Sequence, residues 1–408
     1  KYNYLRTALS ILSLFIIFFS GSGRLYPQDT IATPATYHHN IRSSLLNCQI
    51  RFEKENFGRV AFLGGSITYN SGWRDSKCTY LVKRYPNTDF EFINAGIPSM
   101  GSTPAAFRLE RDVLSKGRID LLFEEAAVND ASNARSSKEQ IRAMEGIIRH
   151  LHYSNPGMNI IMMHFVDPDK IEDYEKGLTP LVIKNHEKVA RHYNIPSINL
   201  ALEVTERIRK GEFNWEDDFR DLHPSPFGQG VYARSMITFL ENAFWVDVNE
   251  EAVFTNFILP EKLDDHCYDK GHLIDITKSE IINGWHLDPS WTPEDKAGVR
   301  SNYHNVPMLV SNQPGSLLRF KFKAKAIGIA VAAGPDAGII EYRIDDGEWQ
   351  HLNLFTQWSM YLHLPWYYTL SAELPDKEHM LELRTSQLKD ERSNGYSCRI
   401  RYFFINKN

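Results

Sequence analysis

Residues 60–68 read VAFLGGSIT, an apolar strand-like run that ends in two glycines and a serine. In a doubly wound α/β sheet, ligands bind beyond the carboxyl ends of the strands, and glycines there allow close backbone approach. Ser66 follows the predicted strand at that edge. Taken alone, such a serine is more readily the N-cap of the next helix. The neighbouring strands must therefore decide between a cap and a nucleophile.

Apolar runs alternate with amphipathic stretches from Gly58 to about Leu240, which predicts a parallel α/β sheet. A helix with one apolar face is predicted over 137–154, and a closing helix over 225–243, after a Pro-containing turn. Four further strands are predicted: DFEFINA (89–95), IDLLFEE (119–125), NIIMMHF (159–165) and IPSINL (195–200).

Beyond about Asp247 the pattern changes to short alternating runs separated by turn signals, such as IIEYRI (339–344) before Asp345-Asp346-Gly347. This pattern predicts a β-sandwich of roughly 150 residues. We therefore divide the chain into four parts: a signal peptide (1–27), an N-terminal segment (28–56), an α/β catalytic domain (57–246) and an accessory β-sandwich domain (247–408).

Two more predicted strands end in residues that suit a catalytic site. FINAGIPSMGS (92–102) places Gly96 and Gly101 after the second strand, and LLFEEAAVND (121–130) places Asn129 after the third. A glycine N–H and an Asn amide can stabilise the negative charge that develops on a carbonyl oxygen during acyl transfer. Turn formation explains either loop alone equally well, but three consecutive strand ends favour the catalytic interpretation.

The stretch DLHPSPFGQGVYA (221–233) places Asp221 and His223 before two prolines and a predicted helix. Serine is a poor nucleophile at its own pKa, so an imidazole must accept its proton. A carboxylate or carbonyl must in turn fix the tautomer of that imidazole. The other histidines lack such a rigid setting. We therefore predict Ser66 as the nucleophile and His223 as the base.

The ordered segments GGSIT, NAGI, AVND and DLHP resemble the four sequence blocks of the SGNH (GDSL-type) hydrolase superfamily. The resemblance covers about residues 57–245. It implies a flavodoxin-like sheet, with Ser66 as nucleophile and His223 as base. It also implies that Gly96 and Asn129 are the oxyanion donors.

Three positions depart from the superfamily pattern. Gly65 stands where many members have Asp, and Ala127 stands where a Gly is common, but neither change removes a reacting group. The triad acid usually lies three residues before the histidine, and Arg220 occupies that position here. Asp221 is our first choice of acid and Asp218 the second. A serine–histidine dyad oriented by a backbone carbonyl is the third option.

Candidate substrate-binding residues are Trp73 and Arg74, which follow Ser66 in a loop or helix start that could overhang the site. A guanidinium suits a carboxylate or a hydroxyl-rich sugar, although a packed indole and a surface salt bridge explain the pair equally well. Aromatic residues also crowd the segment 355–370. They can stack on sugar rings, but we favour packing in the sandwich core. The two-domain arrangement resembles SGNH proteins that gut and soil bacteria deploy against plant polysaccharides.

The first 23 residues place Lys1 and Arg6 before an apolar run from Ala8 to Phe19, followed by small residues. This pattern predicts a secretory leader, because the run is shorter than the roughly 20 residues needed to span a bilayer. We expect a secreted or periplasmic protein without stable membrane insertion after leader removal. The net charge of −5 and the absence of a long Lys/Arg block argue against a nucleic-acid partner.

Only four cysteines occur in 408 residues, too few for a disulfide scaffold, and their spacing fits no metal knuckle. A disulfide between Cys48 and Cys78 stays open at this stage. We predict no metal and no cofactor, and the sequence carries no signal of an oligomeric state.

The leading hypothesis is a serine esterase that removes acyl groups, chiefly acetyl, from a polysaccharide or oligosaccharide through an acyl-serine intermediate. The first alternative, a lipase or thioesterase of the same fold, predicts long apolar loops around the site, whereas the visible loops are polar and modest. The second alternative is a non-catalytic glycan-binding protein that keeps the hydrolase fold only as a scaffold.

Overall fold

The computed structural model describes residues 37–244 and 248–407 of the chain. The predicted leader, residues 1–27, lies outside the described residues. Within the described part, no helix combines the length and the apolar character that a membrane crossing requires.

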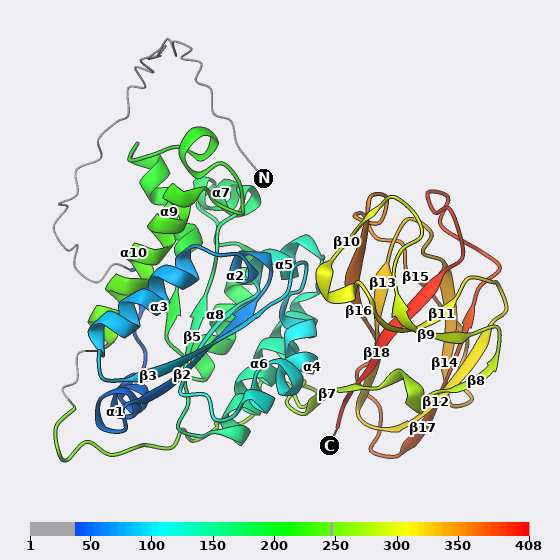
Figure 1. Cartoon of the computed structure of the whole chain (residues 1–408), viewed down its shortest axis with the longest axis horizontal. Coiled ribbons are helices and arrows are strands. Elements are labelled where there is room, and N and C mark those ends of the chain that lie inside the picture. The colour runs from blue at the N-terminus through cyan, green and yellow to red at the C-terminus, as the bar shows by residue number, and fades with distance from the viewer. Residues whose placement is uncertain (1–36, 245–247, 408) are drawn as a thin grey trace, which may run out of the picture. The chain divides into compact units, whose positions relative to one another are not determined.

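The first sheet contains six strands in the order β1-β6-β5-β4-β2-β3 (Figure 1). All neighbouring pairs are parallel except β1, which runs antiparallel to β6 at the edge. Numbered along the chain, the five parallel strands lie in the order 2-1-3-4-5, which is the flavodoxin-like arrangement. The predicted fold class is confirmed, and β1 is an additional strand. The strands are β1 (His39–Asn40), β2 (Phe57–Gly64), β3 (Asp89–Gly96), β4 (Leu121–Glu125), β5 (Asn159–Met163) and β6 (Ser197–Ile198).

This strand order fixes the place of a ligand site. The chain direction across the sheet reverses at β2, which lies between β3 and β4. In open α/β sheets, ligands bind at such a switch point, outside the carboxyl ends of the two strands. Ser66 follows β2 and Asn129 follows β4. The two residues therefore belong to the two loops that flank the switch point.

Helices cover both faces of the sheet, with α3 and α10 on one side and α4 and α6 on the other (Figure 1). The predicted helix over 137–154 forms as α6, where Ser136 accepts a hydrogen bond from the Glu139 N–H as N-cap. The predicted closing helix forms as α10, with Ser225 as N-cap and Pro226 in the first turn. The helices of this domain are α1 (Leu46–Lys54), α2 (Ser66–Tyr69), α3 (Trp73–Arg84), α4 (Ser102–Asp112), η1 (Leu114–Lys116), α5 (Ala127–Ser132), α6 (Ser137–Ser154), α7 (Pro168–Glu175), α8 (Leu181–His192), α9 (Leu200–Arg209), η2 (Trp215–Phe219) and α10 (Pro226–Ala243).

The C-terminal part is an all-β domain of two sheets, as predicted. One sheet has the order β10-β16-β13-β18-β11-β9, with β7 added to β18, and the other has the order β15-β14-β17-β12-β8. Apolar residues from both sheets form one buried core, which makes the domain a sandwich. Its elements are β7 (Gly271–Ile274), η3 (Ile276–Lys278), β8 (Glu280–Asn283), β9 (His286–Trp291), β10 (Gly298–Val299), η4 (Ser301–Tyr303), β11 (Val306–Ser311), β12 (Leu317–Lys323), β13 (Ala326–Ala333), β14 (Ile339–Ile344), β15 (Gln350–Asn353), β16 (Leu362–Ser371), β17 (Glu378–Thr385) and β18 (Cys398–Asn406).

Side chains of the β domain pack directly on the α/β domain. The ring of Phe107 in α4 lies 4.3 Å from the ring of Phe404 in β18, centroid to centroid. The Gln357 side chain donates a hydrogen bond of 2.9 Å to the backbone oxygen of Ser132, at the end of α5. The loop before β16 is therefore joined to the helix that carries Asn129.

The four cysteines are all free thiols, so the Cys48–Cys78 pairing that the sequence left open does not form. Cys48, Cys267 and Cys398 are buried, and Cys78 is partly buried. The fold is therefore held by its apolar cores rather than by disulfides.

Candidate active site

Ser66 and His223 lie together although 157 positions separate them in the chain. The Nε2 atom of His223 is 2.7 Å from the Oγ atom of Ser66. Ser66 is the first residue of α2, directly after β2, and His223 lies in the loop between η2 and α10. The His223 side chain is 43% exposed, so a substrate can reach the pair from solvent. This is the hydrogen-bonded geometry that a serine nucleophile and its base require.

The loop that carries His223 is tightly constrained on its N-terminal side. The segment Trp215–Phe219 is a single π-helical turn, a feature that often occurs at functional sites. Arg220 follows with φ of +78°, a conformation that costs a non-glycine residue roughly 1–3 kcal/mol. The Ser225 N–H donates 2.9 Å to the oxygen of Phe219 and closes the loop. These contacts hold the strained backbone and fix the position of His223.

The acid partner of His223 differs from a buried triad carboxylate. The Oδ1 atom of Asp221 is 3.9 Å from His223 Nδ1, beyond hydrogen-bond length, and the Asp221 side chain is 63% exposed. The same oxygen accepts a 3.3 Å bond from the His223 backbone N–H. The Asp218 carboxylate accepts instead from the Asn214 N–H at 2.9 Å. Asp221 therefore acts on the imidazole through its charge rather than through a direct bond to the ring.

Three influences set the pKa of His223. Burial lowers it below the usual value, the Asp221 charge raises it, and the Arg300 charge lowers it. Arg300 comes from the β domain, where its backbone N–H donates 3.1 Å to the oxygen of His363. The net shift is downward, so the imidazole is neutral near pH 7 and able to accept a proton. Arg300 could not be predicted as part of the site, since no local sequence pattern brings residue 300 to residue 223.

A buried carboxylate supports the turn that presents Ser66. Glu125 Oε1 accepts hydrogen bonds from the Gly65 N–H at 2.7 Å and from the Thr68 hydroxyl at 2.9 Å. Burial raises the pKa of Glu125 to about 7, and the two hydrogen bonds limit that rise. From the sequence alone, Glu125 is only the last residue of a predicted strand. It is a positioning residue, since it contacts the nucleophile turn and not Ser66 itself.

The amide of Asn129 packs against the same turn. Its Oδ1 atom lies 2.1 Å from the point where a side chain on Gly65 would place its Cβ. A residue larger than glycine at position 65 would therefore displace Asn129 in this structure. Asn129 is partly buried, and its side chain makes no hydrogen bond to another described residue. The amide is thus free to bind a ligand.

The structure corrects the prediction for Gly96. Its N–H already donates to the Asn94 side chain at 3.0 Å, so it is not available to an oxyanion. A Cβ on Gly96 would lie 2.4 Å from the Tyr69 nitrogen, so this glycine serves close packing of β3 against α2. Gly101 is the better candidate, because Asp130 bonds the adjacent Ser102 to the loop that carries Asn129. Among the described residues, no acceptor takes the Gly101 N–H.

Asp130 joins the two loops that carry Gly101 and Asn129. Its fully buried carboxylate accepts bonds from the Ser102 N–H at 2.8 Å and the Ser102 hydroxyl at 2.6 Å. The His186 ring also lies 3.0 Å from it. Since Ser102 follows Gly101 and Asp130 follows Asn129, this network fixes the two candidate donors relative to each other.

The two substrate-binding predictions fare differently. The prediction that Trp73 binds substrate is wrong, because its side chain is fully buried and its indole N–H donates a hydrogen bond of 3.1 Å to the Ile67 oxygen. Arg74 is partly buried and lies 3.6 Å from Asp75, and its guanidinium reaches the Asn70 oxygen at 3.5 Å. These contacts are local to the start of α3. No recorded contact brings Arg74 to Ser66 or His223.

Within the described residues, no group of three or more His, Cys, Asp or Glu side chains could hold a metal ion.

Comparisons with known proteins show which fold and which sequence family this chain is similar to. The solved structure of a two-domain esterase (CEX) active on acetylated mannans is similar, with a TM-score of 0.73 and 19% identity over 91% of this chain and 98% of that chain. The same type of esterase co-crystallized with mannopentaose gives a TM-score of 0.70 and 20% identity, over 88% and 93%. At these identities the likeness establishes the shared two-domain fold. No curated protein sequence matches this chain. Residues 62–231 match the sequence profile of the GDSL-like Lipase/Acylhydrolase family. Residues 62–231 of this chain are therefore similar to the GDSL-like Lipase/Acylhydrolase family.

Proposed function

We propose that this protein is a secreted serine esterase that removes acetyl groups from an acetylated polysaccharide or oligosaccharide. The observation that carries the proposal is the 2.7 Å contact between Ser66 Oγ and His223 Nε2. It lies at the switch point of the sheet, where ligands bind in this class of fold. The GDSL-type hydrolase domain supplies the chemical class, and the acyl group and the sugar are the proposed specificity.

The reaction begins with proton transfer from Ser66 Oγ to His223 Nε2 while Oγ attacks the ester carbonyl. The tetrahedral intermediate collapses when His223 returns the proton to the leaving sugar oxygen, which forms acetyl-Ser66. Water then gives a proton to His223 and attacks the acetyl carbonyl. The second intermediate expels Ser66 Oγ, which recovers its proton from His223, and acetate is released.

The negative oxygen of each intermediate needs donors that are already in place. The backbone N–H of Ser66, the N–H of Gly101 and the side-chain amide of Asn129 are the candidates. Their support is positional: Asn129 packs on Gly65, next to Ser66, and Asp130 ties the loop of Gly101 to that of Asn129. Preorganised donors of this kind contribute several kcal/mol to acyl transfer.

The charges around His223 predict opposite pH shifts for two substitutions. The base must be neutral, so kcat/KM falls as pH drops through its pKa. Asp221 raises that pKa and Arg300 lowers it. Asp221→Asn therefore shifts the acid limb of the profile to lower pH, and Arg300→Gln shifts it to higher pH. Profiles of kcat/KM for p-nitrophenyl acetate measure both, and shifts in the same direction would contradict this assignment.

The same measurement bears on the role of Asp221 as acid. Because the carboxylate is exposed and 3.9 Å from the ring, Asp221→Asn should lower kcat by about tenfold. A buried, directly bonded triad aspartate contributes about 10⁴-fold. A loss of that size would mean that Asp221 bonds the imidazole directly during turnover.

Glu125 should matter for activity through the nucleophile turn. In Glu125→Ala the buried Gly65 N–H loses its acceptor, at a cost of about 1–3 kcal/mol, and we expect kcat to fall about 10- to 100-fold. Glu125→Gln keeps an acceptor oxygen and should recover most of the rate. Initial rates and thermal unfolding midpoints of the two variants test this prediction. Equal losses in both would show that the charge, rather than the acceptor, is required.

Two observations and one sequence prediction support a carbohydrate substrate. The two similar structures are of an esterase described as active on acetylated mannans. Trp358 is 48% exposed and follows Gln357, which bonds to the end of the helix that carries Asn129. An exposed indole near the site can stack on a sugar ring. The predicted leader would direct the enzyme to extracellular polymers.

Acetate release from acetylated mannan, xylan and pectin tests the proposal, with p-nitrophenyl palmitate as the lipase control. We expect acetate from at least one polysaccharide and little hydrolysis of the palmitate ester. Efficient palmitate hydrolysis without acetate release would favour a lipase. Inactivity on every ester, p-nitrophenyl acetate included, would favour a non-catalytic glycan-binding protein.

A further inference from the structure

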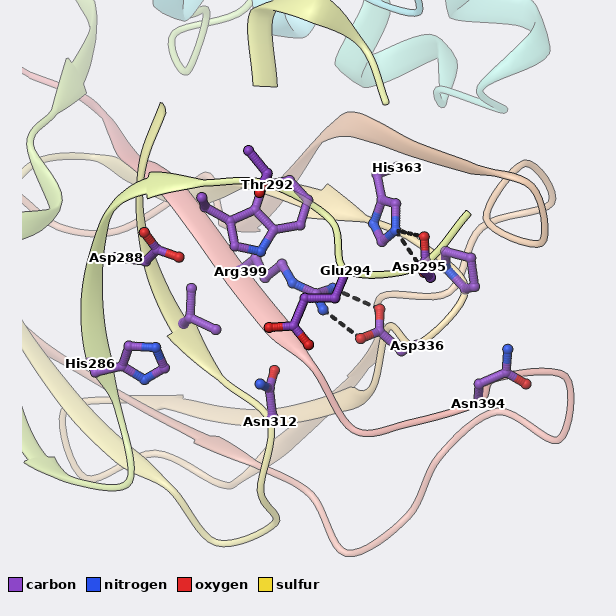
Figure 2. A pocket seen from close by; sticks show the side chains of 13 residues that line it. His286, Asp288, Thr292, Glu294, Asp295, Asn312, Asp336, His363, Asn394 and Arg399 are labelled. Carbon is purple, nitrogen blue, oxygen red and sulfur yellow. Dashed lines mark hydrogen bonds and ion pairs between the residues drawn. The ribbon is translucent and has the colours of Figure 1, made fainter. Parts of the chain in front are cut away.

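The β domain contains a polar pocket of its own, with a cavity volume of about 400 Å³. This size falls within the roughly 300–1,000 Å³ of small-ligand sites. The pocket is formed by β9, β11, β16 and β18 and by the loops that follow β9, β11, β13 and β17 (Figure 2). All thirteen lining residues lie between 286 and 399, so none belongs to the hydrolase domain.

The deepest part of the pocket is rigid. Arg399 is 8% exposed and forms two ion-paired hydrogen bonds with Asp336 (Figure 2). Its guanidinium also lies 5.1 Å from the ring centroid of Trp291, which is 5% exposed. His363 is 1% exposed and lies 3.0 Å from Asp295. The side chains that a ligand would meet here are therefore fixed before it arrives, which reduces the entropic cost of binding.

The upper part of the pocket is a rim of solvent-accessible polar groups. Figure 2 labels Asp288, Glu294 and Asn312 among the side chains that line the pocket. Asn394 adds a further amide. The rim therefore offers carboxylate oxygens as acceptors and amide groups as both donors and acceptors.

The charge balance selects the class of ligand. The permanent cation of the pocket, Arg399, is neutralised by Asp336, and Asp295 faces His363. Asp288 and Glu294 are left as surplus negative charge, so an anionic sugar or a phosphate would be repelled. The polar lining disfavours a large apolar ligand. A neutral, polyhydroxylated molecule is favoured, because its hydroxyl groups can donate to carboxylates and accept from amides.

We propose that this pocket of the β domain is a second carbohydrate-binding site, separate from Ser66, that takes a neutral sugar residue. The hydroxyls of the sugar donate to Asp288 and Glu294 and accept from the Asn312 amide. The proposal concerns binding alone and needs no ester, so it can be tested on unacetylated sugars.

Hydrogen–deuterium exchange of the full chain with unacetylated mannopentaose and xylopentaose tests the site. We expect slower exchange in peptides that cover 286–295 and 394–399 with at least one pentaose. In Asp288→Asn/Glu294→Gln, two charge-assisted hydrogen bonds become neutral ones, so the concentration for half-protection should rise about tenfold. The matched control is Glu348→Gln, an exposed carboxylate outside the pocket, which should behave as wild type.

Several outcomes would overturn the proposal. Protection confined to peptides around Ser66 and His223 would place the sugar in the hydrolase domain alone. Protection of the pocket by tetragalacturonate, but by neither pentaose, would mean an acidic ligand. Equal protection in the wild type and in the double variant would show that Asp288 and Glu294 do not bind the sugar. Hydrolysis of p-nitrophenyl acetate, measured in parallel, reports separately on the proposed esterase and should be unchanged in the double variant.

Discussion

Ser66→Ala and His223→Ala should each lower kcat for p-nitrophenyl acetate by about 10⁴-fold or more. Without Oγ no acyl-enzyme can form, and without the imidazole the hydroxyl keeps its proton. Because the two groups act as a unit, the double variant should be hardly slower than either single variant. Initial-rate measurements on the three purified proteins give this comparison.

The controls separate catalysis from folding. Ser66 is partly buried and His223 is exposed, so we expect changes in unfolding free energy within about 1 kcal/mol. His351→Ala, at a histidine with a 58% exposed side chain in the β domain, should keep wild-type activity. Either catalytic variant retaining more than about a tenth of the wild-type rate would refute the assignment.

Asn129→Ala is expected to lower kcat by about 10²–10³-fold with little change in KM. The amide is proposed to bind the oxygen only when it becomes negative, so its loss affects the transition state more than the bound ester. Because Asn129 is already held against Gly65 before the reaction, its loss should lower kcat strongly. Separate determination of kcat and KM for p-nitrophenyl acetate distinguishes this from a binding role. A raised KM with unchanged kcat would mean that Asn129 holds the substrate and not the oxyanion.

Much of the fold could be predicted because its signals are local. The apolar runs within β2, β4 and β5 are continuous, as expected for strands buried on both faces, whereas the edge strand β3 alternates polar and apolar residues. The apolar spacing over 137–154 predicts a helix, and the structure has α6 over the same residues, with Ser136 as its N-cap. The short edge strand β1 escaped prediction, because its two residues, His39 and Asn40, carry no apolar pattern.

The candidate site was only partly predictable, because several of its features depend on tertiary packing. Trp73 illustrates this limit: its distance from Ser66 in the sequence does not say whether the indole faces the pocket or the core, and it faces the core. Glu125 appeared as the end of a strand, and only the fold brings its carboxylate under Gly65. Arg300 acts on His223 from a different domain. The choice between Gly96 and Gly101 required knowing which N–H already has an acceptor.

The position of Arg220 shows how a departure from the family pattern can be accommodated. The residue at the usual place of the acid adopts a positive φ, and the chain then turns so that Asp221 lies 3.9 Å from the ring. The nearest carboxylate, Asp221, therefore lies two residues before His223 instead of the usual three, and its side chain is exposed to solvent. This arrangement predicts a base whose pKa is set jointly by burial, Asp221 and Arg300, as the opposite pH shifts above would reveal.

The central claim, that His223 activates Ser66 as a nucleophile, is tested most directly by covalent trapping. The full chain is incubated with a fluorophosphonate and digested, and the modified residue is identified by mass spectrometry. We predict one phosphonylated site, at Ser66, and no modification of that peptide in His223→Ala. An unmodified Ser66 in the wild-type protein, or equal labelling in His223→Ala, would contradict the account.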